Sequence, residues 1–332
     1  MTAEQTASAR LASDDPVDLH LHTLASDGFW EPSQLVPYLA SNGFRVASIC
    51  DHDSQRSVLE AMQLGEEHGV RIIPGVEVTT RWSGRQWHLL VYGIRPDRVD
   101  DDAADFLTIL AELDAVLQAN AEDARQRIEA SGKPLPSLPE IAAGRPVWPF
   151  HVLSAAIKEA HVKNLTEAAN LVTELGGSFT ADAELDRTVR AAHKAGGLCV
   201  IAHPGRSDSV GAVTEADLDR MLENIPIDGL EAHYRSYTDA QTALYRRLAI
   251  DRGLLISCGS DSHAPGQPVD PRPWRAAWCA GLLARLGIPV TVPDDPVWVA
   301  GMDTLAALPP DQIKQAEPVA EQAAPAEATV ST

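Results

Sequence analysis

The 332-residue chain is poor in cysteine and in basic residues. Its four cysteines are widely spaced, and Cys50, Cys199 and Cys258 lie inside apolar segments, which indicates buried thiols and excludes a disulfide framework or a zinc ribbon. The chain has 27 Lys and Arg against 47 Asp and Glu. The resulting formal net charge of −20 excludes a general attraction to long nucleic acids or anionic membranes. A polyanionic substrate would therefore have to be attracted locally.

Long apolar segments are also missing. No apolar run reaches the roughly 18 residues that a membrane-spanning helix needs, and the first fifteen residues lack the apolar core of a secretion signal. These absences predict a cytoplasmic protein with no membrane partner.

The alternation of short apolar strands with helices predicts an α/β barrel, and the length suits one such domain with an insertion. A long amphipathic helix is expected from Asp101 to about Ala130, because Phe106, Ile109 and Leu113 recur at helical steps. Further helices are expected over 181–195 and from Arg275 to Leu286. The expected organisation is a disordered lead (1–15), a first part of the barrel (16–100), a helical insertion covering its mouth (101–180), a second part (181–308) and a disordered tail (309–332).

The segment Val17 to Asp27 concentrates metal-binding side chains. His20 and His22 are two residues apart, so both imidazoles leave the same face of an extended strand. Loop-forming residues then follow, and Asp27 can turn back towards these imidazoles. The sequence therefore predicts a chelating group at the end of the first strand.

Other polar residues also border apolar strands, at the edge where ligands bind in parallel sheets and barrels. A hairpin at Arg81–Arg85 is expected to make the strands that carry Glu77 and His88 antiparallel neighbours. One ion uses about four to six ligands, so the whole set predicts more than one divalent metal. The candidate ligands are His20, His22, Asp27, His52, Glu77, His88, His203, Asp261 and His263.

Residues next to these candidates are given other roles. Asp51 and Asp53 flank His52 and are expected to orient ligands. Glu231 and His233 end a strand, so their side chains are expected to point at the mouth, with His233 lining it without binding metal.

These motifs resemble the PHP (polymerase and histidinol phosphatase) family of metal-dependent phosphoesterases over residues 16–265. The resemblance rests on His20-x-His22 with Asp27, Asp51-His52-Asp53, Gly75-Val76-Glu77, His88, Ala202-His203-Pro204-Gly205-Arg206 and Gly259-Ser260-Asp261-Ser262-His263. It implies a distorted (βα)7 TIM-like barrel with up to three metal ions. It also implies that His20, His22, Glu77 and Asp261 hold one ion, that Glu77 bridges to a second with His88 and His203, and that Asp27, His52 and His263 hold the third.

The helical insertion resembles the subgroup of nucleoside 3′,5′-bisphosphate phosphatases, whose relatives also trim short RNA from the 5′ end. The chain departs from that subgroup where its members carry arginines, because it has Ala119-Asn120-Ala121-Glu122 and Trp148-Pro149-Phe150 there. The expected substrate contacts are Arg206, His151 and Arg145, with Arg125 and Arg127 as further candidates to supply the missing charge.

The expected chemistry is phosphomonoester hydrolysis by a hydroxide that bridges two metals and is held by Glu77, His88, His203 and Asp261. Manganese is expected, with iron or zinc as alternatives. The expected substrate is a small nucleotide such as a nucleoside 3′,5′-bisphosphate. The alternatives are a 5′-3′ exonuclease on short oligonucleotides, a histidinol-phosphate phosphatase, and a non-catalytic module that binds nucleotide or phosphate.

Overall fold

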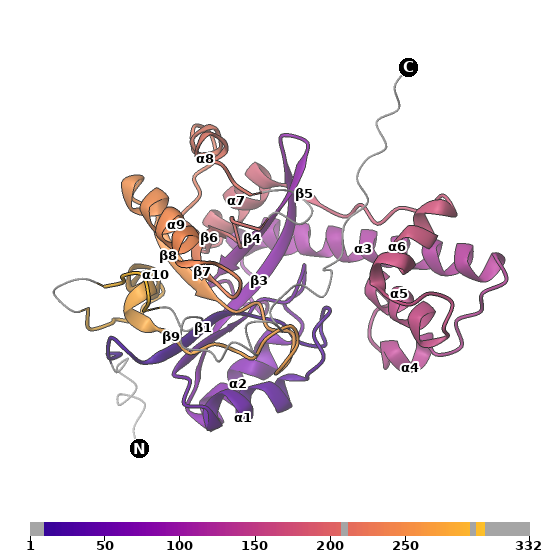
Figure 1. Cartoon of the computed structure of the whole chain (residues 1–332), viewed down its shortest axis with the longest axis horizontal. Helices are drawn as coiled ribbons and strands as arrows, with labels where there is room; N and C mark the ends of the chain where they lie inside the picture. The colour runs from indigo at the N-terminus through magenta and orange to yellow at the C-terminus, as the bar shows by residue number, and fades with distance from the viewer. Residues whose placement is uncertain (1–9, 207–211, 293–296, 303–332) are drawn as a thin grey trace.

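The computed structural model describes residues 10–206, 212–292 and 297–302, so most of the predicted lead and the whole predicted tail lie outside the described residues. Within these residues, nine strands form one sheet that curls into a nearly closed barrel (Figure 1). Their order is β8-β7-β6-β4-β3-β2-β1-β9, and β5 pairs with β3. The strands are β1 Pro16–Leu21, β2 Val46–Ile49, β3 Arg71–Trp82, β4 Arg85–Tyr92, β5 Ala183–Glu184, β6 Leu198–Ile201, β7 Gly229–Tyr234, β8 Leu255–Gly259 and β9 Trp274–Arg275.

The strand directions explain why the barrel is distorted. β1, β2 and β3 run parallel, as do β6, β7 and β8, but β4 lies antiparallel to both β3 and β6. The two ends of the sheet approach each other after β8, where the Ser260 amide donates to the Asp18 carboxylate at 2.9 Å and the Asp261 amide donates to the His20 carbonyl at 2.8 Å. The predicted distorted TIM-like barrel is confirmed.

The hairpin between β3 and β4 confirms the predicted neighbourhood of Glu77 and His88. Thr79 lies opposite His88, and Glu77 lies opposite Leu90. Residues two apart on a strand share a face, so Glu77 and His88 form a diagonal cross-strand pair on one face of the sheet.

Helices cover the barrel on two sides. Figure 1 shows α1 and α2 beside β1 and β2, and α7, α8 and α9 on the other side. Thr238 begins α9 with a reciprocal cap, since its hydroxyl accepts from the Gln241 amide and its own amide donates to the Gln241 side chain. The barrel helices are α1 Pro32–Ser41, α2 Val58–His68, α7 Leu185–Lys194, α8 Glu215–Leu222, α9 Asp239–Asp251 and α10 Ala280–Arg285, the last preceded by the 3₁₀ helix η1 Ala276–Cys279.

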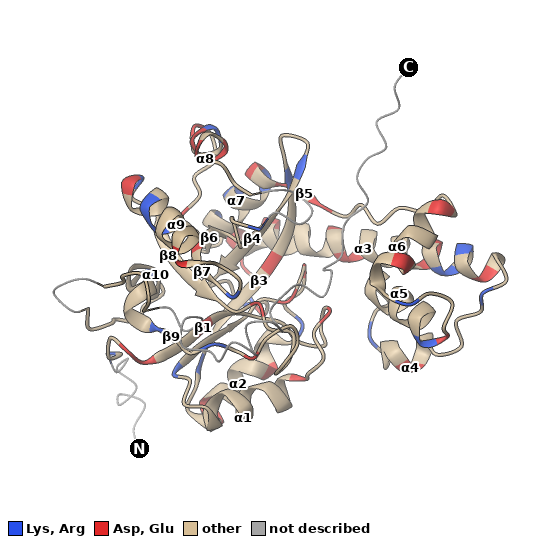
Figure 2. Cartoon of the chain, in the orientation of Figure 1, with Lys and Arg blue, Asp and Glu red and all other residues tan. Residues whose placement is uncertain are grey.

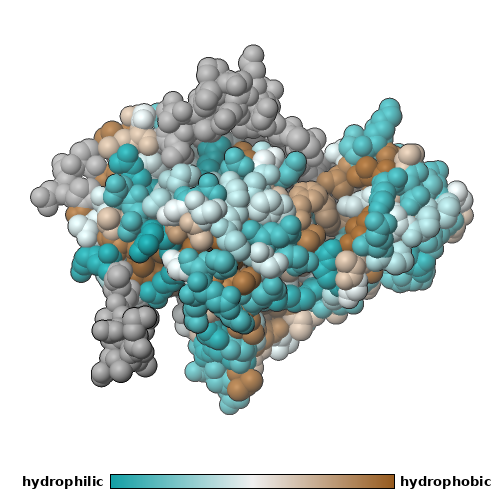
Figure 3. Space-filling model, turned by 90° about the horizontal axis from the view of Figure 1, so that it is seen from below, coloured by the Kyte–Doolittle hydropathy of each residue, from teal (hydrophilic) through white to brown (hydrophobic). Residues whose placement is uncertain are grey.

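The helical insertion projects from the barrel along α3 (Figure 1). The predicted long helix is confirmed as α3 Asp101–Ala130, whose N-cap Asp100 accepts from the Ala103 amide at 3.2 Å. The far half of α3 packs with α4 Leu138–Ala142, α5 Pro149–Lys158 and α6 Leu165–Glu174 around a separate apolar core. Apolar surface is visible between this unit and the barrel (Figure 3).

Three segments differ from the sequence-based expectation, and each difference comes from backbone pairing with a distant segment. The helix expected over 181–195 starts only at Leu185, because Ala183 and Glu184 form β5 against the edge of β3. The helix expected from Arg275 starts later, because Trp274–Arg275 pairs with β1. Leu11, within the predicted disordered lead, is buried and pairs with Val290. These long-range pairings override local propensity.

All four cysteines are buried and free, as the sequence predicts. Among the described helices, none has both the length and the hydrophobicity of a membrane span.

Candidate metal centre

The candidate ligands meet at one end of the barrel, where the parallel strands finish. His20 belongs to β1, Glu77 to β3 and His88 to β4. The other candidates lie in the loops that follow β1, β2, β6 and β8. Three overlapping groups have side-chain ligand atoms within 4.8 Å of one another, namely His20, His22, Glu77 and Asp261; His52, Glu77 and His88; and His22, Asp27, His52 and His263.

The deepest group is fully enclosed by protein. The Nε2 atoms of His20 and His22 lie 3.1 Å apart, and Glu77 Oε2 is 3.0 Å from the first and 3.2 Å from the second. Asp261 Oδ1 lies 2.9 Å from His22 Nε2. Two imidazole nitrogens and two carboxylate oxygens therefore converge on one small volume, which is the donor set that a divalent ion requires.

Glu77 joins this group to its neighbours, because its two oxygens have different partners. Oε2 faces His20 and His22, whereas Oε1 is 3.0 Å from His88 Nδ1 and 2.8 Å from His203 Nε2. His52 Nδ1 is 3.3 Å from Oε2. One buried carboxylate is thus shared by five imidazoles.

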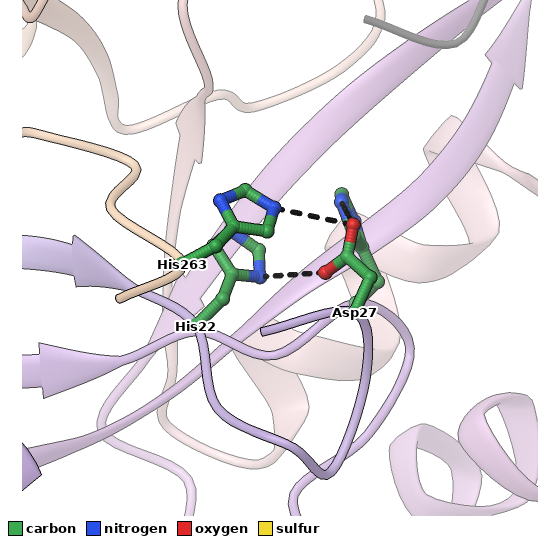
Figure 4. Close-up of side chains that lie close together, drawn as sticks. His22, Asp27 and His263 are labelled. Atoms are coloured by element: carbon green, nitrogen blue, oxygen red, sulfur yellow. Dashed lines mark hydrogen bonds and ion pairs between the residues drawn. The ribbon is translucent and has the colours of Figure 1, made fainter. Parts of the chain in front are cut away.

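The third group lies at the outer edge of the centre. Figure 4 shows Asp27 turned back towards His22 and His263. Asp27 Oδ2 is 3.1 Å from His263 Nε2 and 3.8 Å from His52 Nε2, and its Oδ1 is 3.6 Å from His22 Nδ1. The predicted return of the loop to the imidazoles is therefore present in the fold, and His22 takes part in this group as well as in the deepest one.

Exposure increases from the inner to the outer ligands. The side chains of His20, His22 and Glu77 are inaccessible, whereas His52 is 25 % exposed and Asp27 is 19 % exposed. The outer ligands are therefore the ones that a substrate can reach.

Electrostatics keep the carboxylates ionised. Burial works against ionisation of Glu77, but the positive charge of His20 outweighs it and holds the pKa of Glu77 well below its usual range. Burial likewise opposes ionisation of Asp261, and the Arg235 guanidinium holds the pKa of that carboxyl low. Ionised, buried carboxylates beside imidazoles fit a bound divalent cation.

The histidines divide into two types. Burial lowers the pKa of His52 to about 4 and that of His203 to about 3, which leaves both imidazoles in the neutral, metal-binding form. Burial also disfavours a charge on His22, but its hydrogen bonds to Asp261 and Glu77 raise the pKa of His22 to about 10. A cation bound at His22 would therefore displace a proton.

The backbone is unusual at three of these positions. Asp53, His203 and Asp261 all have positive φ, at 49°, 26° and 52°, a conformation that non-glycine residues rarely adopt and that occurs more often at functional sites. Gly259 is needed for close approach, since a Cβ there would lie 2.2 Å from Glu231 Oε1 and 2.3 Å from His20 Cβ.

Asp51 fixes the loop that carries Asp27. Its carboxylate accepts hydrogen bonds from the Thr23 amide at 2.6 Å, the Thr23 hydroxyl at 2.7 Å and the Ser26 hydroxyl at 2.8 Å, and from the Ser57 hydroxyl. These four donors occupy Asp51 fully.

Asp53 supports β3 in the same way. It accepts from the amide and the hydroxyl of Thr79 at 2.7 and 2.8 Å. Thr79 is two residues from Glu77, so this contact holds the strand that presents the central carboxylate.

Three contributors were not singled out as partners of the ligands from the sequence. Glu231 accepts from His20 Nδ1 at 3.0 Å through one oxygen and from the His203 amide at 2.7 Å through the other. Tyr234 donates its hydroxyl to Asp261 Oδ2 at 2.8 Å, and Arg235 contacts the same oxygen at 2.5 Å. Their position at the end of β7 was the available signal, but only the tertiary structure identifies their partners.

His233 does not line the mouth as predicted. A strand irregularity between Glu231 and His233 turns its ring away from the centre. The imidazole stacks on Trp278, with ring centroids 4.7 Å apart, and its Nε2 lies 2.9 Å from an Arg246 nitrogen. His233 therefore belongs to the packing between β7 and the helices outside the barrel.

The predicted substrate contacts occupy different places. Arg206 lies at the metal centre, with one guanidinium nitrogen 3.6 Å from Asp261 Oδ2 and 3.5 Å from the Tyr234 hydroxyl. Arg145 lies where the insertion meets the barrel and donates to the carbonyl of Leu24, in the loop after β1. His151 is buried beside it in the first turn of α5.

Arg125 and Arg127 lie on the far half of α3 and are engaged there. Arg125 pairs with Glu122 and Glu129, and Arg127 pairs with Asp123. Figure 2 shows acidic and basic residues mixed along this half of the helix. The structure does not bring either arginine together with the candidate ligands.

A fourth group, His193, Cys199 and Asp228, also has ligand-type atoms close together. Asp228 accepts from His193 Nε2 and from the Cys199 amide, each at 2.7 Å. Cys199 is at the start of β6 and His203 follows its end, so this group lies at the other end of the strand, away from the metal centre.

Comparisons with known proteins agree with this geometry. A 5′-3′ exoribonuclease from Haemophilus influenzae is 30% identical over 254 residues, which cover 75% of this chain and 90% of the relative. A 3′,5′-nucleoside bisphosphate phosphatase from Chromobacterium violaceum is 27% identical over 264 residues, or 76% and 88% of the two chains. No protein-family model matches the chain.

A solved structure gives the same fold. The metal-dependent phosphoesterase from Bifidobacterium adolescentis has a TM-score of 0.69 at 21% identity and covers 84% of this chain and 97% of its own. The resemblance predicted from the sequence motifs is thereby confirmed. The chain belongs to the PHP family of metal-dependent phosphoesterases and is a hydrolase of phosphoric ester bonds.

Proposed function

We propose that the chain is a phosphatase that removes one phosphate from a small nucleotide carrying two phosphates, such as a nucleoside 3′,5′-bisphosphate. The observation that carries this proposal is the shared Glu77 carboxylate, whose Oε2 faces His20 and His22 and whose Oε1 faces His88 and His203. This arrangement suits a carboxylate that bridges two cations, which is the basis of two-metal phosphoryl transfer.

The proposed resident ions are two or three divalent metals, manganese first and iron or zinc as alternatives. The donor set of imidazoles and carboxylates supports them. Bound there, they would activate a water molecule as the nucleophile and neutralise the phosphoryl oxygens. The proposed holders are His20, His22, Glu77 and Asp261 for one ion, Glu77, His88 and His203 for a second, and Asp27, His52 and His263 for a third.

Arg206 is proposed to bind the phosphate that reacts. Its guanidinium is close to Asp261 and to Tyr234, and an arginine can donate two parallel hydrogen bonds to phosphate oxygens. Because the chain as a whole is strongly acidic, this local positive charge and the cations are what attract an anionic substrate.

His151 and Arg145 are proposed to bind the second phosphate. The Trp148 amide donates to His151 Nδ1 at 3.0 Å, so in the neutral ring the proton is on Nε2. That buried Nε2 has no hydrogen-bond partner among the described residues. Burial, followed by the charges of Arg145 and Arg56, lowers the pKa of His151 to about 4, so the ring is a neutral donor beside two cations.

This proposal gives the insertion, residues 101–180, a role in substrate selection. Arg145 connects it to the loop after β1, and Arg56, from the barrel, stacks over Trp148 at 4.5 Å and pairs with Asp114 at 3.0 Å. The proposed second-phosphate contacts thus lie where the two units meet.

The test is phosphate release by the metal-loaded full chain from adenosine 3′,5′-bisphosphate and AMP, with histidinol phosphate and an aryl phosphate as further substrates. A charge-assisted contact to the second phosphate should make kcat/KM for the bisphosphate about 10- to 100-fold higher than for AMP. The Asp261→Ala variant is the inactive control. Phosphate release from histidinol phosphate or aryl phosphate alone would reject the nucleoside bisphosphate as the substrate. A metal-loaded protein that releases no phosphate would point to a binding module.

A second candidate is 5′-3′ trimming of short RNA, which is favoured by the 30% identity to the Haemophilus influenzae exoribonuclease. The same assay should include a 5′-phosphorylated trinucleotide. Release of mononucleotides from it with a higher kcat/KM than for the bisphosphate would select this function instead.

A further inference from the structure

Phe29 is an exposed aromatic ring fixed beside the metal centre. It is 53 % exposed and lies two residues after Asp27. Its amide donates to the carbonyl of His263 at 2.8 Å, so its backbone is hydrogen-bonded to the backbone of a second candidate ligand. The ring therefore stays close to the outermost ligand group.

The loop that presents this ring is tightly closed. The Gly28 amide donates to the Thr23 carbonyl at 2.9 Å, and the Leu24 amide donates to the Trp30 carbonyl at 3.0 Å. A Cβ at Gly28 would come within 2.7 Å of the Thr23 backbone, so the two sides of the loop are packed closely against each other there. Phe29 is thus pre-organised and not a side chain on a loose loop.

The insertion places a second ring against the first. Phe150, in the first turn of α5, is half-buried and meets Phe29 edge to face, with ring centroids 6.3 Å apart and planes at 74°. Phe150 also touches His151, with ring centroids 6.2 Å apart. The rings therefore lead from the metal centre to the proposed second-phosphate contacts.

Neither phenylalanine belongs to an apolar core of the described residues. The apolar clusters of the barrel and of the insertion, taken over the described residues, contain neither Phe29 nor Phe150. Between two anion-binding regions, an uncharged ring face is suited to the uncharged part of a nucleotide.

We propose that Phe29 and Phe150 form a stacking platform for the nucleobase of the substrate. This inference rests on the proposed function and deepens it, since it makes the enzyme selective for nucleotides over sugar phosphates. Stacking uses the π face that every base has, so the platform distinguishes base from no base and tolerates different bases.

The test compares adenosine 3′,5′-bisphosphate with its abasic analogue, 1,2-dideoxyribose 3,5-bisphosphate. Removing the ring in Phe29→Ala should lower kcat/KM for the adenosine compound about 5- to 100-fold, in keeping with the loss of one stacked base. It should leave the abasic compound and the metal content unchanged. Phe29→Tyr should keep the wild-type preference, and Ile250→Ala, which truncates an exposed side chain on α9, is the matched control.

Equal losses on both compounds would show that Phe29 only supports the Asp27 loop and would overturn the proposal, as would no loss on either. A wild-type protein that cleaves neither compound would reject the proposed function separately. In that case a 2-aminopurine nucleotide reports on the platform, because stacking quenches its fluorescence. Quenching by wild type that is lost in Phe29→Ala supports the platform, and absence of quenching rejects it.

Discussion

The mouth of the barrel and the core of the insertion bury opposite kinds of side chain. At the mouth, His20, His22 and Glu77 are inaccessible and contact one another. In the insertion the core is aliphatic, with Val152 and Leu153 at its centre, and charges pair on the surface. A compact apolar core stabilises itself, whereas a buried cluster of imidazoles and carboxylates needs a counter-charge. The first region therefore fits a bound cation, and the second stabilises the fold of the insertion.

The strongest test of this contrast is Glu77→Gln. The amide keeps the shape of the side chain but removes the negative charge that five imidazoles share, so metal binding should fall. We expect kcat/KM to drop by about 10²- to 10⁴-fold, corresponding to the roughly 3–5 kcal/mol of a broken buried ion pair. Metal analysis by mass spectrometry and phosphate release measure the two effects.

Glu140→Gln is the matched control in the insertion, because Glu140 is exposed and pairs only on the surface with Lys158. Wild-type activity in Glu77→Gln, or an equal loss of activity and metal in Glu140→Gln, would contradict the contrast between the charged mouth of the barrel and the insertion.

A smaller effect is expected from Glu231→Gln. Glu231 orients His20 and His203 but is not among the candidate ligands, so its loss should weaken metal binding about 10- to 100-fold, as for other residues that orient ligands. Titration of activity against metal concentration measures the shift. Excess metal should restore most of the turnover, and failure of this rescue would mean that the substitution disrupts the fold.

Leu153→Ala tests the same contrast in the core of the insertion. Truncating this buried leucine should cost about 2–5 kcal/mol of unfolding free energy, through lost burial and the cavity left behind. Denaturant unfolding measures this cost, and the metal content should not change. Leu89→Ala, an equivalent truncation beside His88 in β4, should lower both stability and metal content. Loss of metal in Leu153→Ala would show that the two units are not separate.

The smallest expected effect is the pH dependence contributed by His151. Its folded pKa of about 4 is below the value of 6.5 for an unperturbed histidine, so the unfolded chain binds its proton first as the pH falls. Stability should therefore decline between pH 6.5 and 4, and His151→Gln should remove about 1–3 kcal/mol of that decline. Thermal unfolding across this pH range tests it. His68→Gln, at an exposed histidine on α2, should behave like wild type, and an unchanged decline in His151→Gln would contradict the assignment.

The local sequence was sufficient for most of the elements. Apolar periodicity predicted α3 from Asp101 to Ala130, and the hairpin at Arg81–Arg85 was predicted to make the strands of Glu77 and His88 antiparallel neighbours. The spacing of His20 and His22 predicted their common face. These features depend on residues a few positions apart, so the local sequence is enough to predict them.

Tertiary structure decided what depends on distant partners. β5 exists because Ala183 meets the edge of β3, which no local pattern encodes. The irregularity in β7 sends Glu231 towards His20 and His233 towards Trp278, although both were expected to point at the mouth because they end a strand. The motifs alone determined the kind of chemistry. Only the closed fold determined which groups contact the candidate ligands, such as Glu231 beside His20, and which rings lie beside them.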